Sequence, residues 1–286
     1  MNLQLLSLKI SRSENLPVLP TVVVQILKLF DDRNVSARSL VRIIEQDAGM
    51  SAKVLRVAGS PMYGLRSVNT VDRAISILGM STLRSIAISL AYQQILNRRG
   101  PKPAFDQLAF WRNSLAVGIG ARELMRYVNG GLAEEMYVAG LMHGVGILAL
   151  DRFAQPELAR AMKSATVKRI PLREAEMTVN GFDHCQVGGI LADQWKLSPV
   201  VGNIIKYYDT PDADTETHQS TLVAAGASYL AYHCGFPVVP GLPGSEDGLE
   251  HLSKLELGQD KIDFVATKIM AEVDAADEAM GSARAA

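Results

Sequence analysis

Hydrophobic residues recur along much of the chain at the spacing of an α-helix. In two stretches they fall at positions i, i+3, i+4 and i+7: Val71, Ala74, Ile75 and Leu78, and Val23, Ile26, Leu27 and Phe30. Because a helix turns once in about 3.6 residues, each set lies on one helical face that can pack against a core. Patterns typical of strands have little support. We therefore predict an all-α fold.

The clearest interruption of this pattern lies at residues 98–103, Arg-Arg-Gly-Pro-Lys-Pro. Two prolines and a glycine disfavour a continuous helix there. We divide the chain at this point into a helical lobe of residues 1–100, a linker of residues 101–103 and a second helical lobe of residues 104–286, which ends in a frayed tail. We expect the two lobes to share an apolar interface.

Shorter signals mark individual helix ends in the second lobe. Ser198-Pro199 is typical of a helix start, because serine caps the first turn and proline fits its first position. Asn129-Gly130-Gly131 and Asn180-Gly181 supply residues that tolerate a positive φ, which favours helix ends at both places.

Composition and charge narrow the class of protein. The chain has 286 residues, of which 48% are hydrophobic and 6% aromatic, so its core is expected to be aliphatic. Its formal net charge of -1 provides no positive field for a phosphate backbone, which makes nucleic acid an unlikely partner. The most apolar run, residues 137–150, is shorter than the roughly 20 residues of a membrane span. We expect a cytoplasmic protein without a membrane segment.

The two cysteines, Cys185 and Cys234, each follow a histidine. A disulfide between them is possible, but two cysteines in a chain of this length favour free thiols. Zinc binding is disfavoured because adjacent side chains on a helix point in different directions. We expect no resident cofactor.

Residues 141–146, Leu-Met-His-Gly-Val-Gly, resemble the Leu-Leu-His-Asp-x-Gly helix of the HD phosphohydrolase superfamily. In that superfamily the adjacent His and Asp both bind a divalent metal that activates water for phosphoester hydrolysis. Here His143 is present, but the position of the Asp is Gly144. The resemblance therefore implies a relative of a hydrolase that lacks part of the metal site.

Four blocks in the N-terminal third resemble the HDOD domain, a bacterial signalling module related to HD domains. They are residues 16–20, 43–58, 59–64 and 74–79, in the order and spacing of that family. The family usually has Asn-Ser where this chain has Gly59-Ser60. With the C-terminal blocks, the resemblance covers roughly residues 15–235 and implies a two-lobed helical HDOD bundle.

The same resemblance identifies the positions where relatives carry metal ligands. Five of them hold residues that are poor or impossible ligands for a transition metal or a hard cation: Asn113, Gly144, Tyr207, Tyr208 and Ser228. The histidines His143 and His184 remain. Two neutral imidazoles without a matched carboxylate make a poor site for a hard cation, so we predict no tightly bound divalent metal and no catalytic residue.

The remaining polar residues have two interpretations. If the ancestral cavity is open, a pocket for a nucleotide-like small ligand would be lined by Asn113, His143, His184 and one of Tyr207 and Tyr208. Alternatively, each histidine is a hydrogen-bonded residue of the core, as buried polar groups need partners in any fold. Separately, Arg98 and Arg99 lie in a locally basic stretch that is either a solvated helix end or a contact surface for a partner.

These observations favour a non-catalytic regulatory module that acts in bacterial signal transduction by binding signalling proteins. The signalling role comes from the resemblance alone, and the pathway, with cyclic di-GMP or a sensor kinase as examples, stays open. The alternative is a metal-dependent phosphohydrolase or phosphodiesterase that acts on a nucleotide or cyclic dinucleotide with replacement ligands. A third hypothesis is a small-ligand sensor that uses the cavity without turnover.

Overall fold

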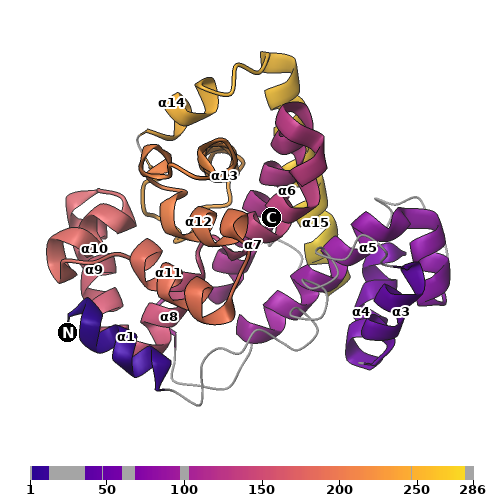
Figure 1. Cartoon of the computed structure of the whole chain (residues 1–286), viewed down its shortest axis with the longest axis horizontal. Coiled ribbons are helices and arrows are strands. Elements are labelled where there is room, and N and C mark those ends of the chain that lie inside the picture. The colour runs from indigo at the N-terminus through magenta and orange to yellow at the C-terminus, as the bar shows by residue number, and fades with distance from the viewer. Residues whose placement is uncertain are drawn as a thin grey trace. The chain divides into compact units, whose positions relative to one another are not determined.

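The computed structural model describes residues 2–12, 36–46, 48–59, 68–96, 103–245 and 247–280. Within these ranges the chain is helical and contains no strand (Figure 1), so the prediction of an all-α fold is confirmed. The contacts divide the chain into two compact units. Unit 1 comprises Met1–Leu16 and Gly100–Ile269, and unit 2 comprises Pro17–Arg99 and Met270–Ala286.

Unit 1 begins with helix α1 (Leu3–Ser11), whose side chains Leu6 and Ile10 are fully buried. These residues lie four positions apart and form one apolar stripe. The Asn2 side chain caps the helix by accepting the amide hydrogen of Leu5, and Lys9 Nζ donates to the carbonyl of Phe153 at 2.6 Å. The sequence division assigned α1 to the lobe of residues 1–100, whereas in the structure α1 packs within unit 1.

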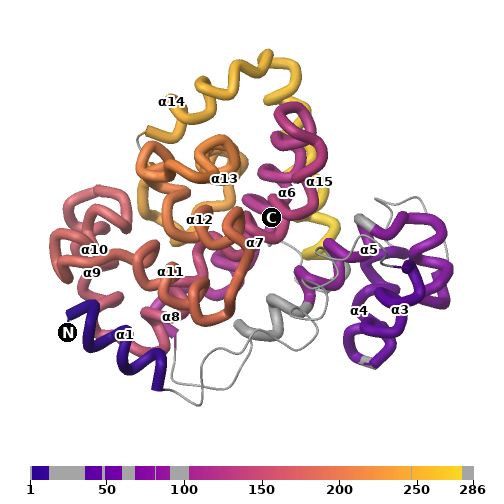
Figure 2. The backbone as a smooth tube through the Cα atoms, in the orientation of Figure 1, coloured from indigo at the N-terminus to yellow at the C-terminus, as the bar shows by residue number. Residues whose placement is uncertain are grey.

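The other helices of unit 1 run from α6 to α15 along the chain, and α6 packs against α7 and α13 (Figure 2). Their bounds are α6 (Gln107–Asn129), α7 (Ala133–Met142), α8 (Val145–Phe153), α9 (Gln155–Lys168), α10 (Leu172–Asn180), α11 (His184–Trp195), α12 (Pro199–Tyr207), α13 (His218–His233), α14 (Gly248–Ser253) and α15 (Gln259–Met280), with 3-10 turns at Gly130–Leu132 and Pro211–Ala213. Helix α15 passes from unit 1 into unit 2 at Ile269.

Two close helix contacts in unit 1 depend on glycine. A Cβ on Gly140 of α7 would lie only 2.9 Å from the Cα of Gly118 in α6. A Cβ on Gly146 of α8 would overlap the carbonyl oxygen of His184, at the start of α11. Close packing at these points leaves no room for a side chain, and it places the first turn of α11 directly against α8.

All three helix-end signals mark helix boundaries in the structure. Ser198 caps α12 through its hydroxyl, with Pro199 as the first helical residue, and Gly181 follows α10 with a φ of 75°. Helix α6 ends at Asn129 as expected, but Gly130 has a φ of -55° and continues into a 3-10 turn. The chain therefore changes direction there without using the positive φ that glycine permits.

Unit 2 contains α3 (Ala37–Glu45), α4 (Ala48–Ala58) and α5 (Val71–Leu96). The predicted stripe begins α5, where Val71, Ala74 and Ile75 are buried. Gly79 interrupts this helix with a φ of 81°, which other residues rarely adopt. The second predicted stripe, residues 23–30, lies outside the described residues, as do Arg98 and Arg99.

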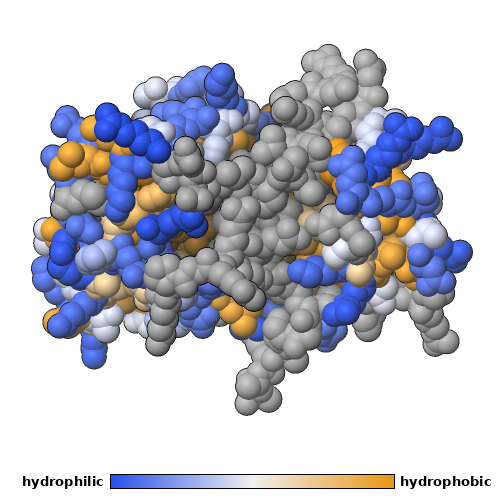
Figure 3. All heavy atoms as spheres, turned by 90° about the horizontal axis from the view of Figure 1, so that it is seen from below, coloured by the Kyte–Doolittle hydropathy of each residue, from blue (hydrophilic) through white to orange (hydrophobic). Residues whose placement is uncertain are grey.

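Within the described residues, no single helix is long and apolar enough to cross a membrane, although the two segments of α5, Val71–Met80 and Thr82–Leu90, pass the test of length and composition as a pair bent by 115°. Some large hydrophobic side chains are exposed, among them Leu5 and Val167. On the face drawn in Figure 3, hydrophobic areas are separated by hydrophilic side chains. Single exposed apolar residues are normal on protein surfaces, and we infer no docking surface from them.

Candidate functional site

Unit 1 contains a cavity of about 280 Å³ beneath the segment that joins α13 to α14. Four of the five residues predicted to form a pocket line it: Asn113, His143, His184 and Tyr208. Ser228 of α13, at another position where relatives carry a ligand, also lines it. The structure thus brings together residues from five helical segments that are far apart in the sequence.

Asn113 is buried in the second turn of α6. Its amide Nδ2 donates to the carbonyl oxygen of Phe236 at 2.7 Å, which fixes the beginning of the segment that covers the cavity. Its carbonyl Oδ1 is buried and has no hydrogen-bond partner in the described part of the chain. An unsatisfied buried acceptor costs free energy, and such groups are few in folded proteins.

His143 lies in a turn between two helices. The apolar run of residues 137–150 was predicted as one buried helix, but it divides into α7 and α8 at His143-Gly144. The His143 Nδ1 lies 2.7 Å from the carbonyl oxygen of Gly140, so Nδ1 carries the proton and Nε2 is an acceptor. Burial lowers the pKa of His143 from 6.5 to about 4, and the ring is neutral at pH 7.

Gly144 does not line the cavity. A Cβ at this position would lie 3.1 Å from Cε2 and 3.3 Å from Cζ of the Phe110 ring, which is fully buried. The space that an aspartate side chain would need is therefore next to a packed aromatic ring. The surroundings of Gly144 on this side are therefore apolar.

His184, the first residue of α11, uses both ring nitrogens inside the protein. Its Nδ1 lies 2.6 Å from Oε2 of Glu176, and its Nε2 lies 2.7 Å from the hydroxyl of Tyr208. Glu176 Oε2 also accepts the backbone amide hydrogen of His184 at 2.9 Å. Although burial alone lowers it, the carboxylate of Glu176 raises the pKa of His184 well above 6.5. The two residues form a buried ion pair that extends to Tyr208.

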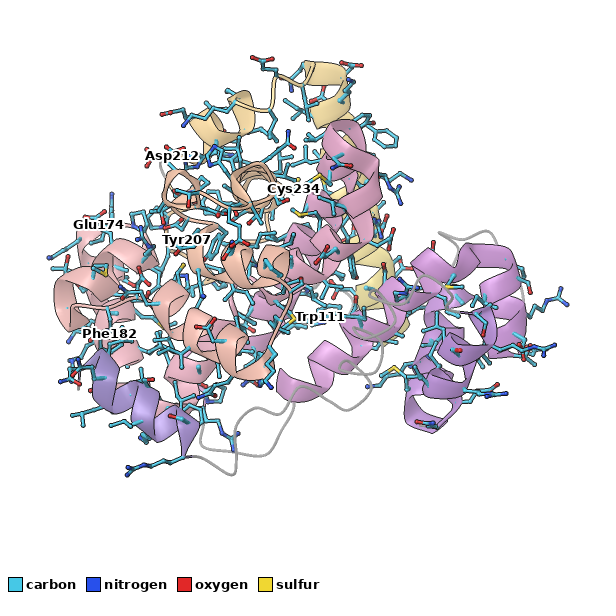
Figure 4. The ribbon with its side chains drawn as sticks, viewed as in Figure 1. Trp111, Glu174, Phe182, Tyr207, Asp212 and Cys234 are labelled. Carbon is cyan, nitrogen blue, oxygen red and sulfur yellow. The ribbon has the colours of Figure 1, made fainter. Side chains whose placement is uncertain are left out.

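The two tyrosines after Lys206 point in different directions. Tyr208 is buried, contacts the His143 ring edge-to-face with centroids 4.7 Å apart, and lines the cavity. Burial raises the pKa of its hydroxyl above its ordinary range. Tyr207, labelled in Figure 4, is the last residue of α12 and does not line the cavity. Of the two predicted tyrosines, Tyr208 therefore lines the cavity and Tyr207 does not.

A charged group forms another wall of the cavity. Arg173 of α10 donates from Nε to Asp183 at 2.8 Å, and its Nη1 lies 3.7 Å from Asp209. Burial raises the pKa of Asp209, which lines the cavity together with Arg173 and His251. Asp183 also caps α11 by accepting the amide hydrogen of Gln186 at 2.8 Å. The guanidinium of Arg173 is thus largely balanced by two carboxylates.

These residues do not fit the divalent metal that the resemblance implies. The nitrogens of His184 are both engaged, Phe110 packs beside Gly144, and Asn113 offers a single amide oxygen. Across the described ranges, no group of three or more His, Cys, Asp or Glu residues is placed to hold a metal ion. The cysteines are both free.

Several important residues were not predicted, above all Glu176, Arg173 and Asp209. The Glu176 side chain is fully buried, with no solvent-accessible surface. A signal for it exists in the sequence, because Glu176 shares the buried face of α10 with Leu172 and Ala175 at spacings of four and one. An acidic residue on an apolar helical face indicates a buried partner, here His184.

The fold and the site together define an all-helical domain with a cavity to which α6, α11 and α13 contribute polar side chains. The family model of the HDOD domain matches residues 16–211. The chain belongs to the HDOD domain family.

Two comparisons show how far the similarity extends. An uncharacterized protein of Treponema pallidum (strain Nichols) is 22% identical over 209 residues, and the match covers 72% of this chain but only 40% of that relative. The solved structure of an HDOD domain protein with unknown function from Geobacter sulfurreducens is 23% identical, with a TM-score of 0.80 over 96% of this chain and 97% of that one.

A second similar structure carries an enzymatic name. It is a "Putative phosphohydrolase" of Shewanella amazonensis SB2B, 23% identical, with a TM-score of 0.64 over 92% of this chain and 97% of that chain. Similarity at this level of identity shows the shared fold. What each protein does depends on its own site.

Proposed function

We propose that this chain is a non-catalytic regulatory HDOD module of bacterial signal transduction, which acts by binding signalling proteins. The observation that carries the proposal is the contact of 2.7 Å between His184 Nε2 and the hydroxyl of Tyr208. The other ring nitrogen faces Glu176. A histidine that ligates a metal needs one ring nitrogen free for it, and His184 has neither.

The contact between Gly144 and Phe110 supports the same proposal independently. Metal-dependent hydrolysis needs a cation that lowers the pKa of a bound water, and the cation needs anionic or imidazole ligands. At Gly144 the chain supplies no ligand, and the neighbouring ring leaves little room for one. Restoring a single aspartate therefore restores neither the ligand set nor the space.

The first test concerns turnover. We expect the wild type and Gly144→Asp to show no hydrolysis of cyclic di-GMP or of a nitrophenyl phosphodiester above a protein-free control, in buffers with Mn²⁺ or Fe²⁺. Elemental analysis should find no stoichiometric metal in the purified chain. Gly144→Asp should also melt at a lower temperature, because it places a carboxylate without partners against Phe110. Wild-type turnover that disappears in His143→Ala would establish the hydrolase instead.

The second test concerns partners and rests on the basic stretch that contains Arg98 and Arg99. We expect the double charge reversal Arg98→Glu, Arg99→Glu to lower the recovery of crosslinked signalling proteins from the native cell several-fold. A matched reversal, Lys168→Glu with Arg169→Glu, alters an exposed basic pair at the end of α9. Equal recovery with both double variants would exclude the basic stretch at Arg98 and Arg99 as the contact surface.

A further inference from the structure

The carboxylate of Asp209, on the wall of the cavity, is only partly paired. Its contact with Arg173 Nη1, at 3.7 Å, is longer than a hydrogen bond between nitrogen and oxygen, about 2.7–3.2 Å. Within the described ranges the Asp209 side chain makes no hydrogen bond. Because this side chain is 18% exposed and lines the cavity, its carboxylate is open to a molecule inside.

The described charged groups around Asp209 leave an excess of negative charge. The imidazolium of His184 is paired with Glu176, and the guanidinium of Arg173 donates to Asp183 at 2.8 Å. The carboxylate of Asp209 is left over. Burial raises the pKa of this carboxyl, because its neighbours do not fully replace the hydration that it has lost. A cation bound beside Asp209 would compensate its charge.

His251 of α14 provides a second hydrogen-bond acceptor beside Asp209. It lines the cavity and is close enough to Asp209 for an electrostatic interaction between the two side chains. Its ring makes no hydrogen bond in the part of the chain that the structure describes. A neutral imidazole has one nitrogen that accepts a hydrogen bond. A cation with several N–H donors, such as a primary ammonium group, can therefore donate to both residues.

The rest of the cavity is mostly apolar. Apolar side chains come from α10 and from the segment that joins α13 to α14, among them Leu172, Val238, Val239 and Leu242. A divalent metal ion does not suit this arrangement, because it needs about six oxygen ligands. The volume of about 280 Å³ lies near the lower end of small-molecule sites, about 300–1,000 Å³. The cavity thus fits a small molecule with an apolar body.

We propose that the cavity binds a small primary amine with an apolar body, of the class of alkylamines and arylalkylamines. The ammonium group of the amine donates to Asp209 and His251. Its hydrocarbon part lies against Leu172 and the apolar residues of the segment that joins α13 to α14. The inference goes beyond the proposed function, which rests on the surroundings of His184 and Gly144 and does not require an occupied cavity.

Titration calorimetry of the full chain with probes of matched shape tests the proposal. One series is 3-methylbutylamine, 3-methylbutanol and 4-methylpentanoate, and the other is 2-phenylethylamine, 2-phenylethanol and 3-phenylpropionate. At pH 8 the amines are protonated, whereas an ordinary imidazole is neutral. We expect at least one amine to bind with a stoichiometry near one and at least ten times more tightly than its alcohol and its carboxylate. Failure of both amines to bind would overturn the proposal, and so would a smaller difference in affinity.

Variants of the cavity locate the bound amine. Asp209→Asn removes the charge at nearly constant size and Ser228→Leu fills the cavity, so each should weaken binding at least tenfold. Asp212→Asn is the matched control, because the Asp212 carboxylate also contacts one cation, Lys254 Nζ at 3.3 Å, but does not line the cavity. If Asp209→Asn does not fold, Ser228→Leu decides the test. Unchanged affinity in a folded cavity variant would overturn the proposal.

The amine site and the proposed function fail on different results. Absence of amine binding, in a wild type that hydrolyses no phosphodiester, would refute the amine site alone. Hydrolysis by a wild type that also binds an amine through Asp209 would refute the non-catalytic function and support the amine site.

Discussion

Replacing Glu176 by alanine is expected to lower the free energy of unfolding at pH 6 by about 3–5 kcal/mol. The change removes the carboxylate that pairs with the imidazolium of His184 at 2.6 Å and accepts its backbone amide hydrogen at 2.9 Å. Both residues are buried. The variant keeps a buried imidazole and an amide that have lost their partner, and the whole domain is stable by only about 5–15 kcal/mol.

Urea unfolding of both proteins measures this difference. Asp193→Ala is the control, because it breaks an exposed pair with Lys206 at 2.9 Å, and such pairs contribute at most about 1 kcal/mol. If Glu176→Ala lowers the free energy of unfolding no more than Asp193→Ala does, the buried pair does not support the fold. A folded Glu176→Gln variant extends the series, since its amide can still accept a hydrogen bond but carries no charge.

The pair also gives stability a dependence on pH with a defined sign. The folded pKa of His184 is raised above the unfolded value of 6.5. The folded state therefore holds a proton that the unfolded state releases as pH rises. The contribution of the His184–Glu176 pair to the free energy of unfolding is fully present below pH 6.5. It decreases as the pH rises toward the folded pKa of His184. The difference between wild type and Glu176→Ala should narrow over that range.

The sequence predicted much of the cavity because the family resemblance fixes positions along the chain. Asn113, His143 and His184 stand at positions where the resemblance implies metal ligands, and all three line the cavity. The choice between Tyr207 and Tyr208 required the structure, since neighbours on a helix face different directions. The end of α12 at Tyr207 sets which of the two turns inward, and helix ends are the least certain part of a sequence pattern.

The partners of these residues were harder to predict. Glu176 and Arg173 reach the site from α10, which is polar in overall sequence, so that Leu172 and Ala175 give only a weak signal of a buried face. The position of α1 is a similar case. Its buried residues Leu6 and Ile10 predict an amphipathic helix, but nothing in them specifies that the helix packs near Phe153 of α8. Local patterns determine elements, while long-range packing determines their neighbours.

His143 is expected to make the protein less stable as the pH falls from 6.5 to 4, by an amount on the order of 3 kcal/mol. Burial lowers its folded pKa from 6.5 to about 4. Between pH 6.5 and 4 the unfolded chain binds a proton at His143 that the folded chain does not bind. The stabilisation is therefore complete above the unfolded pKa and is lost as the pH falls through the folded pKa, at roughly 1.4 kcal/mol per pH unit.

The measurement is the free energy of unfolding in urea at several pH values between 7 and 4, for the wild type and His143→Gln. Other groups titrate over this range in both proteins, so the informative quantity is the difference between their pH slopes. His218→Gln is the control, because His218 makes the same kind of hydrogen bond, to the carbonyl of Pro211 at 2.9 Å, from an exposed position. A wild-type slope equal to that of His143→Gln would mean that burial does not lower the pKa of His143 in the folded protein.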